Sequence, residues 1–143
     1  MANKGNFASR KSEDTKVEAK KKIVVLEETR TLFLQNNKIP SIEGMASVLE
    51  EVMWNKEKLL WIDLSNNHLV TVDEDLASCF PLLKTLYLHG NFMMDMQVIM
   101  KFRELEHLQT LTLYGNPIEH VKNYRLIVLN VLYQSLMNLR KFD

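Results

Sequence analysis

The sequence predicts an α/β right-handed solenoid, with a parallel β-sheet on its concave face and helices or turns on its convex face. Three observations predict this fold. The pattern L-x-x-[LI]-x-L-x-x-N-x-[LIM] begins at Leu59, Leu83 and Leu108, and a shorter copy begins at Leu32. The asparagines of the four copies are 30, 24 and 25 residues apart. Such periods are typical of leucine-rich repeats, in which every repeat forms one coil of a stack.

The alternation inside each repeat predicts which side chains are buried. Successive side chains of a strand lie on opposite faces, so the leucines point into the coil and the residues between them point outward. The asparagine lies where the chain turns inward. Its amide can satisfy backbone groups of the turn and of the next coil, which would otherwise be buried without partners. These structural asparagines are Asn37, Asn67, Asn91 and Asn116.

The N-terminal part of the chain differs in composition from the repeats. Residues 1–22 carry seven Lys and Arg against three acidic residues, and few large apolar side chains. Such a segment cannot offset its ordering entropy, so we expect a basic, disordered tail. Either it stays solvated or it docks on an acidic surface. We expect the repeat domain to span residues 23–143, with the apolar run at 23–26 forming its N-terminal edge.

The segments between the strands show helical spacing. Apolar residues from Ile42 to Met53 recur every one or three positions, which predicts an amphipathic helix of about three turns with Ser41 as its N-cap. The segment after repeat 2 is shorter and ends near Phe80.

The region from about residue 116 to residue 143 is predicted to form a C-terminal helical cap. Val121, Tyr124, Val128, Val131 and Leu132 form one apolar stripe, which can seal the last coil. A second stripe lies nearly opposite and contains Leu126, Leu129 and Tyr133. This second stripe either packs on the final segment, residues 136–142, or remains exposed as a secondary partner surface.

The outward positions of the strands define the main candidate site. They are rich in aromatic side chains, which are typical interface anchors and contribute roughly 2 kcal/mol or more each at hot spots. We expect a partner helix to lie across this face. The alternative is that the aromatic residues only stabilise the sheet by cross-strand packing. The candidate residues are Phe33, Trp61, Asp63, Tyr87, His89, Thr112 and Tyr114.

Composition and motifs argue against several other functions. A formal net charge of zero does not favour electrostatic binding of nucleic acid. The single cysteine, Cys79, excludes an internal disulfide, and with the lack of an N-x-[ST] sequon it favours a reducing, intracellular compartment. We expect neither a signal peptide nor a membrane span. Metal-ligand spacings, nucleotide-binding motifs and nucleophile motifs are missing, so we expect no cofactor, metal or enzymatic activity.

Several blocks resemble the leucine-rich repeat-containing protein 51 family, part of the SDS22-like superfamily with a C-terminal cap. The resemblance covers roughly residues 30–143. It implies a sealing helix, a final strand, and an interaction role without catalysis in the cytoplasm, within the axoneme of a cilium or flagellum. Two related roles remain open: ribonucleoprotein assembly of the U2 snRNP A-prime type, and SDS22-type phosphatase regulation. The blocks are Leu60–Ser65, Leu86–Asn91, Leu111–Pro117, Tyr124-Arg125 and Val128-Leu129.

Overall fold

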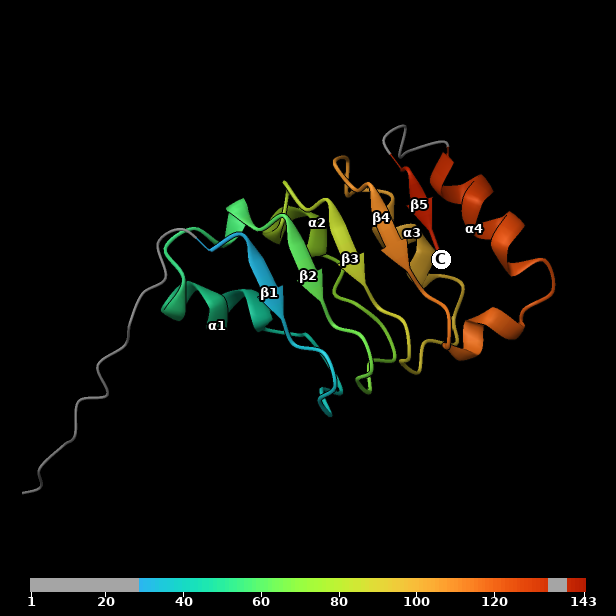
Figure 1. Ribbon diagram of the computed structural model, residues 1–143, viewed down its shortest axis with the longest axis horizontal. Helices are drawn as coiled ribbons and strands as arrows, with labels where there is room; N and C mark the ends of the chain where they lie inside the picture. Colours follow the sequence, from blue (N-terminus) through green and yellow to red (C-terminus); the bar gives the residue numbers. More distant parts are fainter. Residues whose placement is uncertain (1–28, 134–138) are drawn as a thin grey trace, which may run out of the picture.

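The computed structural model describes residues 29–133 and 139–143, and it confirms the predicted α/β repeat fold (Figure 1). Five strands form one parallel sheet in chain order, and neighbouring strands pair in the register that the repeats predict. The predicted tail and the run at residues 23–26 lie outside the described residues. The strands are β1 (Thr31–Phe33), β2 (Trp61–Asp63), β3 (Thr85–Tyr87), β4 (Thr110–Thr112) and β5 (Lys141–Phe142).

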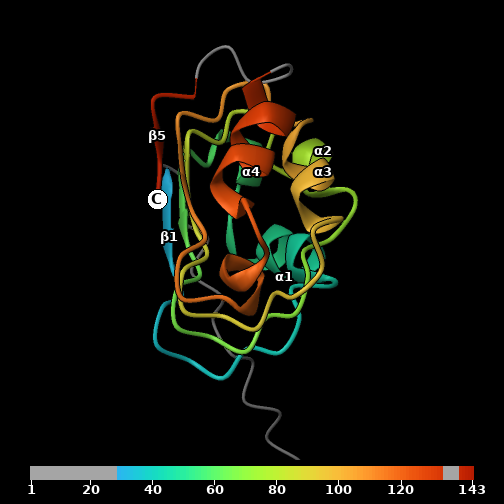
Figure 2. The ribbon, with the colours of Figure 1, turned by 90° about the vertical axis from the view of Figure 1, so that its right-hand side faces the viewer.

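Short helical segments connect the strands on the other side of the sheet. Figure 2 shows the strands along one side of the molecule and the helices on the opposite side. This arrangement follows from the repeat pattern, because each coil must return to the start of the next parallel strand. The segments are α1 (Met45–Val52), η1 (Lys56–Lys58), α2 (Leu76–Cys79), α3 (Val98–Phe102), η2 (Pro117–His120) and α4 (Tyr124–Tyr133).

The core fills the space between the sheet and the helices. In the second repeat, Leu59, Ile62, Leu64 and Leu69 are completely buried, as the repeat pattern predicts. Equivalent residues of the third and fourth repeats are also buried and belong to the same cluster. Each coil therefore buries its apolar residues against its neighbours, and the stack shares one core.

The repeat asparagines join adjacent coils. The Nδ2 of Asn91 donates to the carbonyl oxygens of Leu64 and Leu88, and its Oδ1 accepts from the backbone N–H of Leu69 at 3.0 Å. Asn67 and Asn116 make equivalent contacts. Each amide therefore bonds to the preceding coil. The prediction that it bonds to the next coil was wrong.

The first asparagine differs from the other three. Asn37 is exposed, and among the described residues its side chain bonds only to carbonyl oxygens of its own turn, those of Leu34 and Gln35. The described structure contains no coil before the first repeat for it to join.

The first outer helix begins later than the sequence predicts. It spans eight residues, just over two turns, and starts at Met45. Gly44 precedes it with φ 73°, a left-handed conformation that glycine adopts without steric cost. Ser41 is therefore not the N-cap; its Oγ accepts a hydrogen bond from the N–H of Glu43 instead. The helix thus begins three residues later than a cap at Ser41 predicts, directly after a glycine with positive φ.

The C-terminal cap has the predicted helix and final strand. In α4, the side chains of Tyr124, Val128 and Leu132 are buried, so this stripe seals the last coil. Val121 precedes the helix and is partly exposed. Strand β5 pairs with β4 and extends the sheet by one strand.

Candidate functional site

The outer face of the sheet carries a continuous series of aromatic rings, which we call the aromatic cluster: Phe33, Trp61, Tyr87, His89 and Tyr114. Ring centroids of successive members lie 6.1, 5.4, 5.9 and 4.5 Å apart. These separations suit edge-to-face and offset-stacked packing. The last pair is nearly parallel, with an interplanar angle of 11°. Five rings, three from strands β1, β2 and β3 and two from the segments that follow β3 and β4, therefore form one surface. It lies on the face that Figure 2 shows free of described helices.

Trp61 is the half-buried centre of this surface. It lies between Phe33 and Tyr87, whose rings contact it from the neighbouring strands. Its Nε1 is buried and has no hydrogen-bond partner in the described structure. An unpaired buried donor costs about 1–3 kcal/mol, which offsets part of the stabilisation that the packing of the tryptophan ring contributes.

Thr112 is placed differently from the prediction. We expected it to face solvent beside the aromatic side chains, but it is 6% exposed. Its Oγ1 lies 2.9 Å from the Nδ1 of His89, so the imidazole ring is hydrogen-bonded to it. Thr112 therefore holds the His89 ring in position through this hydrogen bond, and its own side chain is too buried to contact a partner.

Asp63 is also held by the protein itself. Its Oδ1 accepts hydrogen bonds from the N–H of Ser65 at 3.0 Å and from the Oγ of Ser65 at 2.6 Å. These bonds form an Asx turn at the end of β2 and fix the carboxylate on the side of the aromatic cluster where the strands end. Asp63 remains half-buried and can present only part of its carboxylate to a partner.

The second stripe of the cap helix is exposed. The exposed fractions are 68% for Leu126, 42% for Leu129 and 82% for Tyr133. Of the two alternatives for this stripe, these values agree with the exposed one. Residues 136–138 of the final segment lie outside the described residues.

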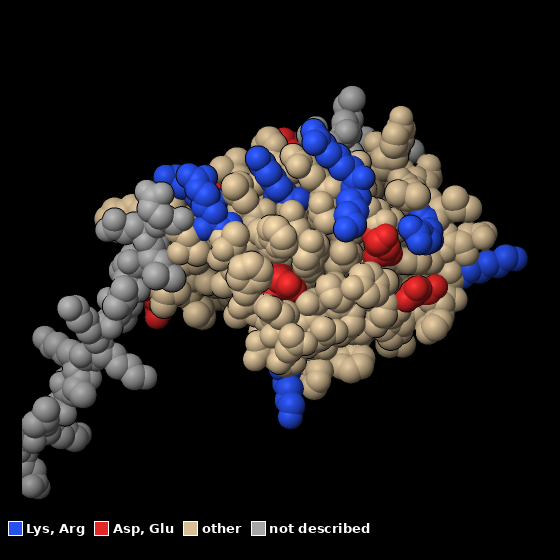
Figure 3. Space-filling model, in the orientation of Figure 1, with Lys and Arg blue, Asp and Glu red and all other residues tan. Residues whose placement is uncertain are grey.

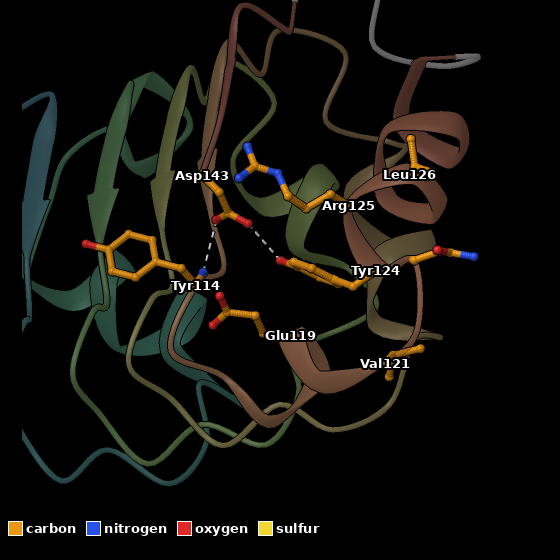
Figure 4. A pocket seen from close by; sticks show the side chains of 8 residues that line it. Tyr114, Glu119, Val121, Tyr124, Arg125, Leu126 and Asp143 are labelled. Carbon is orange, nitrogen blue, oxygen red and sulfur yellow. Dashed lines mark hydrogen bonds between the residues drawn. The ribbon is translucent and has the colours of Figure 1, made fainter.

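A pocket of about 730 Å³ lies between the aromatic cluster and the cap helix (Figure 4). Asp143 connects its two sides, because its Oδ1 accepts from the N–H of Tyr114 and its Oδ2 accepts from the hydroxyl of Tyr124. Burial, followed by the nearby charge of Asp143, raises the pKa of Tyr124 far above its usual range. The two predicted partner surfaces thus meet at this pocket. Its lining residues are Tyr114, Glu119, Val121, Asn123, Tyr124, Arg125, Leu126 and Asp143.

The sequence prediction missed a set of basic residues along one edge of this face. Arg30, Lys84 and Arg140 stand immediately before β1, β3 and β5, and all three are exposed. In Figure 3, Lys and Arg gather along the upper part of the face, the side on which the strands begin. A comparison of the residues just before each strand would have found this set.

The described residues contain neither a metal-site geometry nor a membrane helix. No three His, Cys, Asp or Glu side chains in residues 29–133 and 139–143 are grouped to hold a metal ion. Within the same ranges, no helix is long and apolar enough to cross a membrane. The groups that the site offers to a partner are therefore its aromatic rings and the charged side chains around them.

The fold and the site define a class of protein: a repeat protein that binds other proteins. The features that define it are the stacked coils, the asparagine contacts between them and the aromatic face of the sheet. A family model described as Leucine-rich repeat matches residues 54–143, and the chain belongs to this family. Leucine-rich repeat proteins act in protein–protein interaction, commonly through the concave face of the solenoid. In this chain, the concave face corresponds to the face of the sheet that carries the aromatic cluster. We call it the strand face.

The chain is similar to proteins named Leucine-rich repeat-containing protein 51, which confirms the resemblance predicted from sequence. It is 42% identical to the protein of Rattus norvegicus over 101 residues, which are 71% of this chain and 52% of the relative. For the protein of Homo sapiens the identity is 39% over 104 residues, or 73% of this chain and 54% of the relative. The chain thus spans about half the length of these curated relatives.

Two solved structures share the fold. The Drosophila melanogaster SNF/U2A' complex matches with a TM-score of 0.61 and 21% identity, covering 81% of this chain and 60% of that chain. The Chaetomium Mex67:Mtr2 subunits match with a TM-score of 0.55 and 19% identity, covering 78% of each chain. At these identities, the similarity shows the fold alone.

Proposed function

We propose that this protein is a non-catalytic scaffold that binds another protein through the aromatic cluster of its strand face. The observation that carries the proposal is the continuous contact of Phe33, Trp61, Tyr87, His89 and Tyr114 on a face that no described helix covers. Large aromatic side chains are enriched at binding hot spots because they bury much area with few rotatable bonds.

Cross-strand packing alone does not account for this cluster. Phe33 and Tyr114, at its two ends, are about half exposed. Trp61, at its centre, keeps a buried N–H without a partner, although a phenylalanine would avoid that cost. An unpaired buried polar group of this kind is characteristic of functional surfaces. These features support binding over a purely structural role.

The dimensions of the cluster suit one helix of a partner. It extends from β1 to the segment after β4, which is three strand spacings or about 14 Å across the sheet. That length corresponds to between two and three turns of an α-helix. A helix that crosses the strands can therefore contact every ring of the cluster with a single apolar stripe.

We place this scaffold in the axoneme of a cilium or flagellum, as a small subunit of a larger assembly in the cytoplasm. This setting is what the resemblance to the leucine-rich repeat-containing protein 51 family implies, and the similarity to relatives of that name supports the resemblance. A tagged copy of the chain in ciliated cells is expected to concentrate in the cilium. A purely nuclear signal would overturn the axonemal setting.

The alternative is a role in ribonucleoprotein assembly. It is favoured by a 29% identity over 115 residues to the probable U2 small nuclear ribonucleoprotein A' of Caenorhabditis elegans, covering 70% of this chain and 46% of the relative. The shared fold with a chain of the SNF/U2A' complex agrees with it. A nuclear tagged copy that co-purifies with spliceosomal RNA would favour this alternative.

A double substitution tests the binding surface itself. Trp61→Ala with Tyr87→Ala is expected to leave the circular dichroism spectrum native-like and to abolish co-purification of the partner. A matched control is Trp54→Ala with Phe92→Ala, which removes two exposed aromatic residues outside the strands. The control is expected to retain the partner. Retention of all partners by the first variant would show that the aromatic cluster is not the binding surface.

A further inference from the structure

The residues just before the strands form a row that alternates between basic and neutral side chains. Backbone hydrogen bonds place the five positions side by side: the N–H of Leu60 donates to Arg30, that of Lys84 to Leu60, that of Gln109 to Lys84 and that of Arg140 to Gln109. A basic side chain thus occurs on every second strand. We call Arg30, Lys84 and Arg140 the basic row.

The side chains of the basic row are available to a partner. All three are exposed, and none forms an ion pair with another residue of the described ranges. Lys141, the next residue after Arg140, is exposed as well and lies at the same edge of the sheet. The charges of this edge are therefore not compensated within the described structure.

The spacing of the basic row matches the repeat of an α-helix. Strands of a sheet lie about 4.8 Å apart, so cations on every second strand are separated by about 10 Å. Two turns of helix rise about 10.8 Å and contain about seven residues. A helix that crosses the strands can therefore place side chains seven positions apart opposite Arg30, Lys84 and Arg140 in turn.

Three carboxylates lie on the other side of the aromatic cluster from the basic row, with Arg125 also lining the pocket there. Asp63 follows the middle of the aromatic cluster, while Glu119 and Asp143 lie at the pocket beside Tyr114. In Figure 3, Asp and Glu lie below the Lys and Arg of the upper edge in the middle of this face, while single Lys or Arg side chains also project at its lower and right-hand margins. These carboxylates would repel the phosphates of a nucleic acid strand. A protein segment whose two flanks differ in charge therefore fits this face better.

We propose that the partner segment is an amphipathic helix lying across the strands, with its apolar stripe on the aromatic cluster and acidic residues at seven-residue intervals facing the basic row. This proposal rests on the proposed function and adds the charge pattern and the orientation of the bound helix. The acidic flank fixes which side of the helix faces the start of the strands, because reversing it would place like charges together.

Two synthetic helical peptides of ~21 residues test the charge pattern. Both carry the same leucine stripe; one has Glu at three flank positions seven residues apart, and the other has Lys there. Their binding to the full chain is measured by fluorescence anisotropy at low and at high salt. We expect the Glu peptide to bind about tenfold more tightly at low salt, from three rim pairs, and the preference to shrink at high salt.

Variants of the chain separate this proposal from the proposed function. Lys84→Glu with Arg140→Glu is expected to remove the preference for the Glu peptide. A control with the same charge change, Lys38→Glu with Lys122→Glu, alters exposed lysines outside the basic row and is expected to keep the preference. Trp61→Ala with Tyr87→Ala is expected to weaken both peptides equally. Thermal unfolding checks that each variant is folded.

The possible outcomes differ for the two proposals. Equal binding of both peptides, with loss in the aromatic variant, would overturn the charge pattern and leave binding at the aromatic cluster intact. Failure of both peptides to bind would overturn both proposals. Tighter binding of a single-stranded RNA oligonucleotide than of the Glu peptide, lost in the Lys84→Glu and Arg140→Glu variant, would assign the basic row to nucleic acid instead.

Discussion

The hydroxyl of Tyr124 donates a hydrogen bond to the Oδ2 of Asp143 at 2.9 Å and thereby joins the first residue of the cap helix to the residue after the last strand. The other oxygen of Asp143 accepts from the backbone N–H groups of Leu113 and Tyr114. One carboxylate therefore connects α4, β5 and the end of β4. Hydrogen bonds to charged groups stabilise more than neutral ones do.

The Asp143→Ala substitution is expected to lower the free energy of unfolding by about 2 kcal/mol, because it leaves two backbone donors and the Tyr124 hydroxyl without their acceptor. Urea denaturation followed by circular dichroism measures the change. Lys141→Ala, at an exposed position two residues earlier, is the control and should have little effect. Identical midpoints for Asp143→Ala and the native chain would exclude a stabilising role of this contact.

The burial of Tyr124 predicts a loss of stability at high pH. Its pKa in the folded chain is raised above the ordinary value of 10.0, first by burial and then by the charge and hydrogen bond of Asp143. Between the unfolded and folded pKa values, the unfolded chain releases a proton that the folded chain retains. Stability is therefore unaffected by this group below about pH 10 and falls above it, by up to about 1.4 kcal/mol per pH unit.

The measurement compares the native chain with Tyr124→Phe between pH 8 and pH 11. The difference in unfolding free energy between the two should be constant up to about pH 10 and shrink above it, since phenylalanine does not titrate. Parallel pH profiles of the two proteins across the whole range would show that Tyr124 ionises normally in the folded state.

The repeat asparagines should differ in their contribution to stability. Asn91→Ala leaves the buried N–H of Leu69 without its acceptor and should cost about 2 kcal/mol. The carbonyl oxygens of Leu64 and Leu88 each lose one of two hydrogen bonds and keep those from Asn67 and Asn116. Asn37→Ala removes only exposed contacts within one turn and should cost less than about 1 kcal/mol. Equal losses in urea denaturation would show that contacts between coils contribute nothing beyond the turn itself.

Trp61 should matter more for binding than for folding. The Trp61→Phe substitution removes the buried N–H that lacks a partner, and it also removes some packing area, so the two effects oppose each other. We expect the free energy of unfolding to change by less than about 1 kcal/mol, while binding of the leucine-striped peptides weakens. A large loss of thermal stability with unchanged peptide binding would assign Trp61 to the sheet alone.

The single cysteine should react slowly with alkylating reagents. Burial, followed by the neighbouring charge of Asp75, raises the pKa of the Cys79 thiol, so less of the reactive thiolate exists at neutral pH. Iodoacetamide labelling followed by mass spectrometry should be slower for the folded chain than in urea. Asp75→Ala should accelerate labelling of the folded chain; an unchanged rate would show that Asp75 does not influence the thiol.

The sequence predicted the position of the outer segments but not their exact bounds, which depend on local backbone conformation. The apolar spacing located the first outer helix but not its start, because the left-handed conformation of Gly44 ends the preceding turn there. The direction of the asparagine contacts depends on how the coils stack, which a single repeat does not show. The two stripes of the cap helix were visible in the sequence, but only packing decides that Tyr124, Val128 and Leu132 form the buried one.

Much of the candidate site followed from strand alternation, and the rest depended on neighbouring strands. Phe33, Trp61, Tyr87, His89 and Tyr114 lie on the strand face as the outward positions predict. Alternation also placed Thr112 outward, yet it is buried and hydrogen-bonded to the ring of His89, which follows the adjacent strand β3. The basic row was missed because its members are more than 50 residues apart in the chain and meet only through the sheet register.

The repeat fold follows from the amino-acid sequence alone, because a fixed period of leucines and asparagines can bury its apolar side chains only by stacking coils. The sequence also determines which residues of each strand face outward, since that follows from the geometry of a single strand. Which of those residues remain accessible depends on how the coils pack against one another. Contact between rings, the covering of Thr112 and the alignment of Arg30, Lys84 and Arg140 arise between coils, where residues distant in the chain become neighbours.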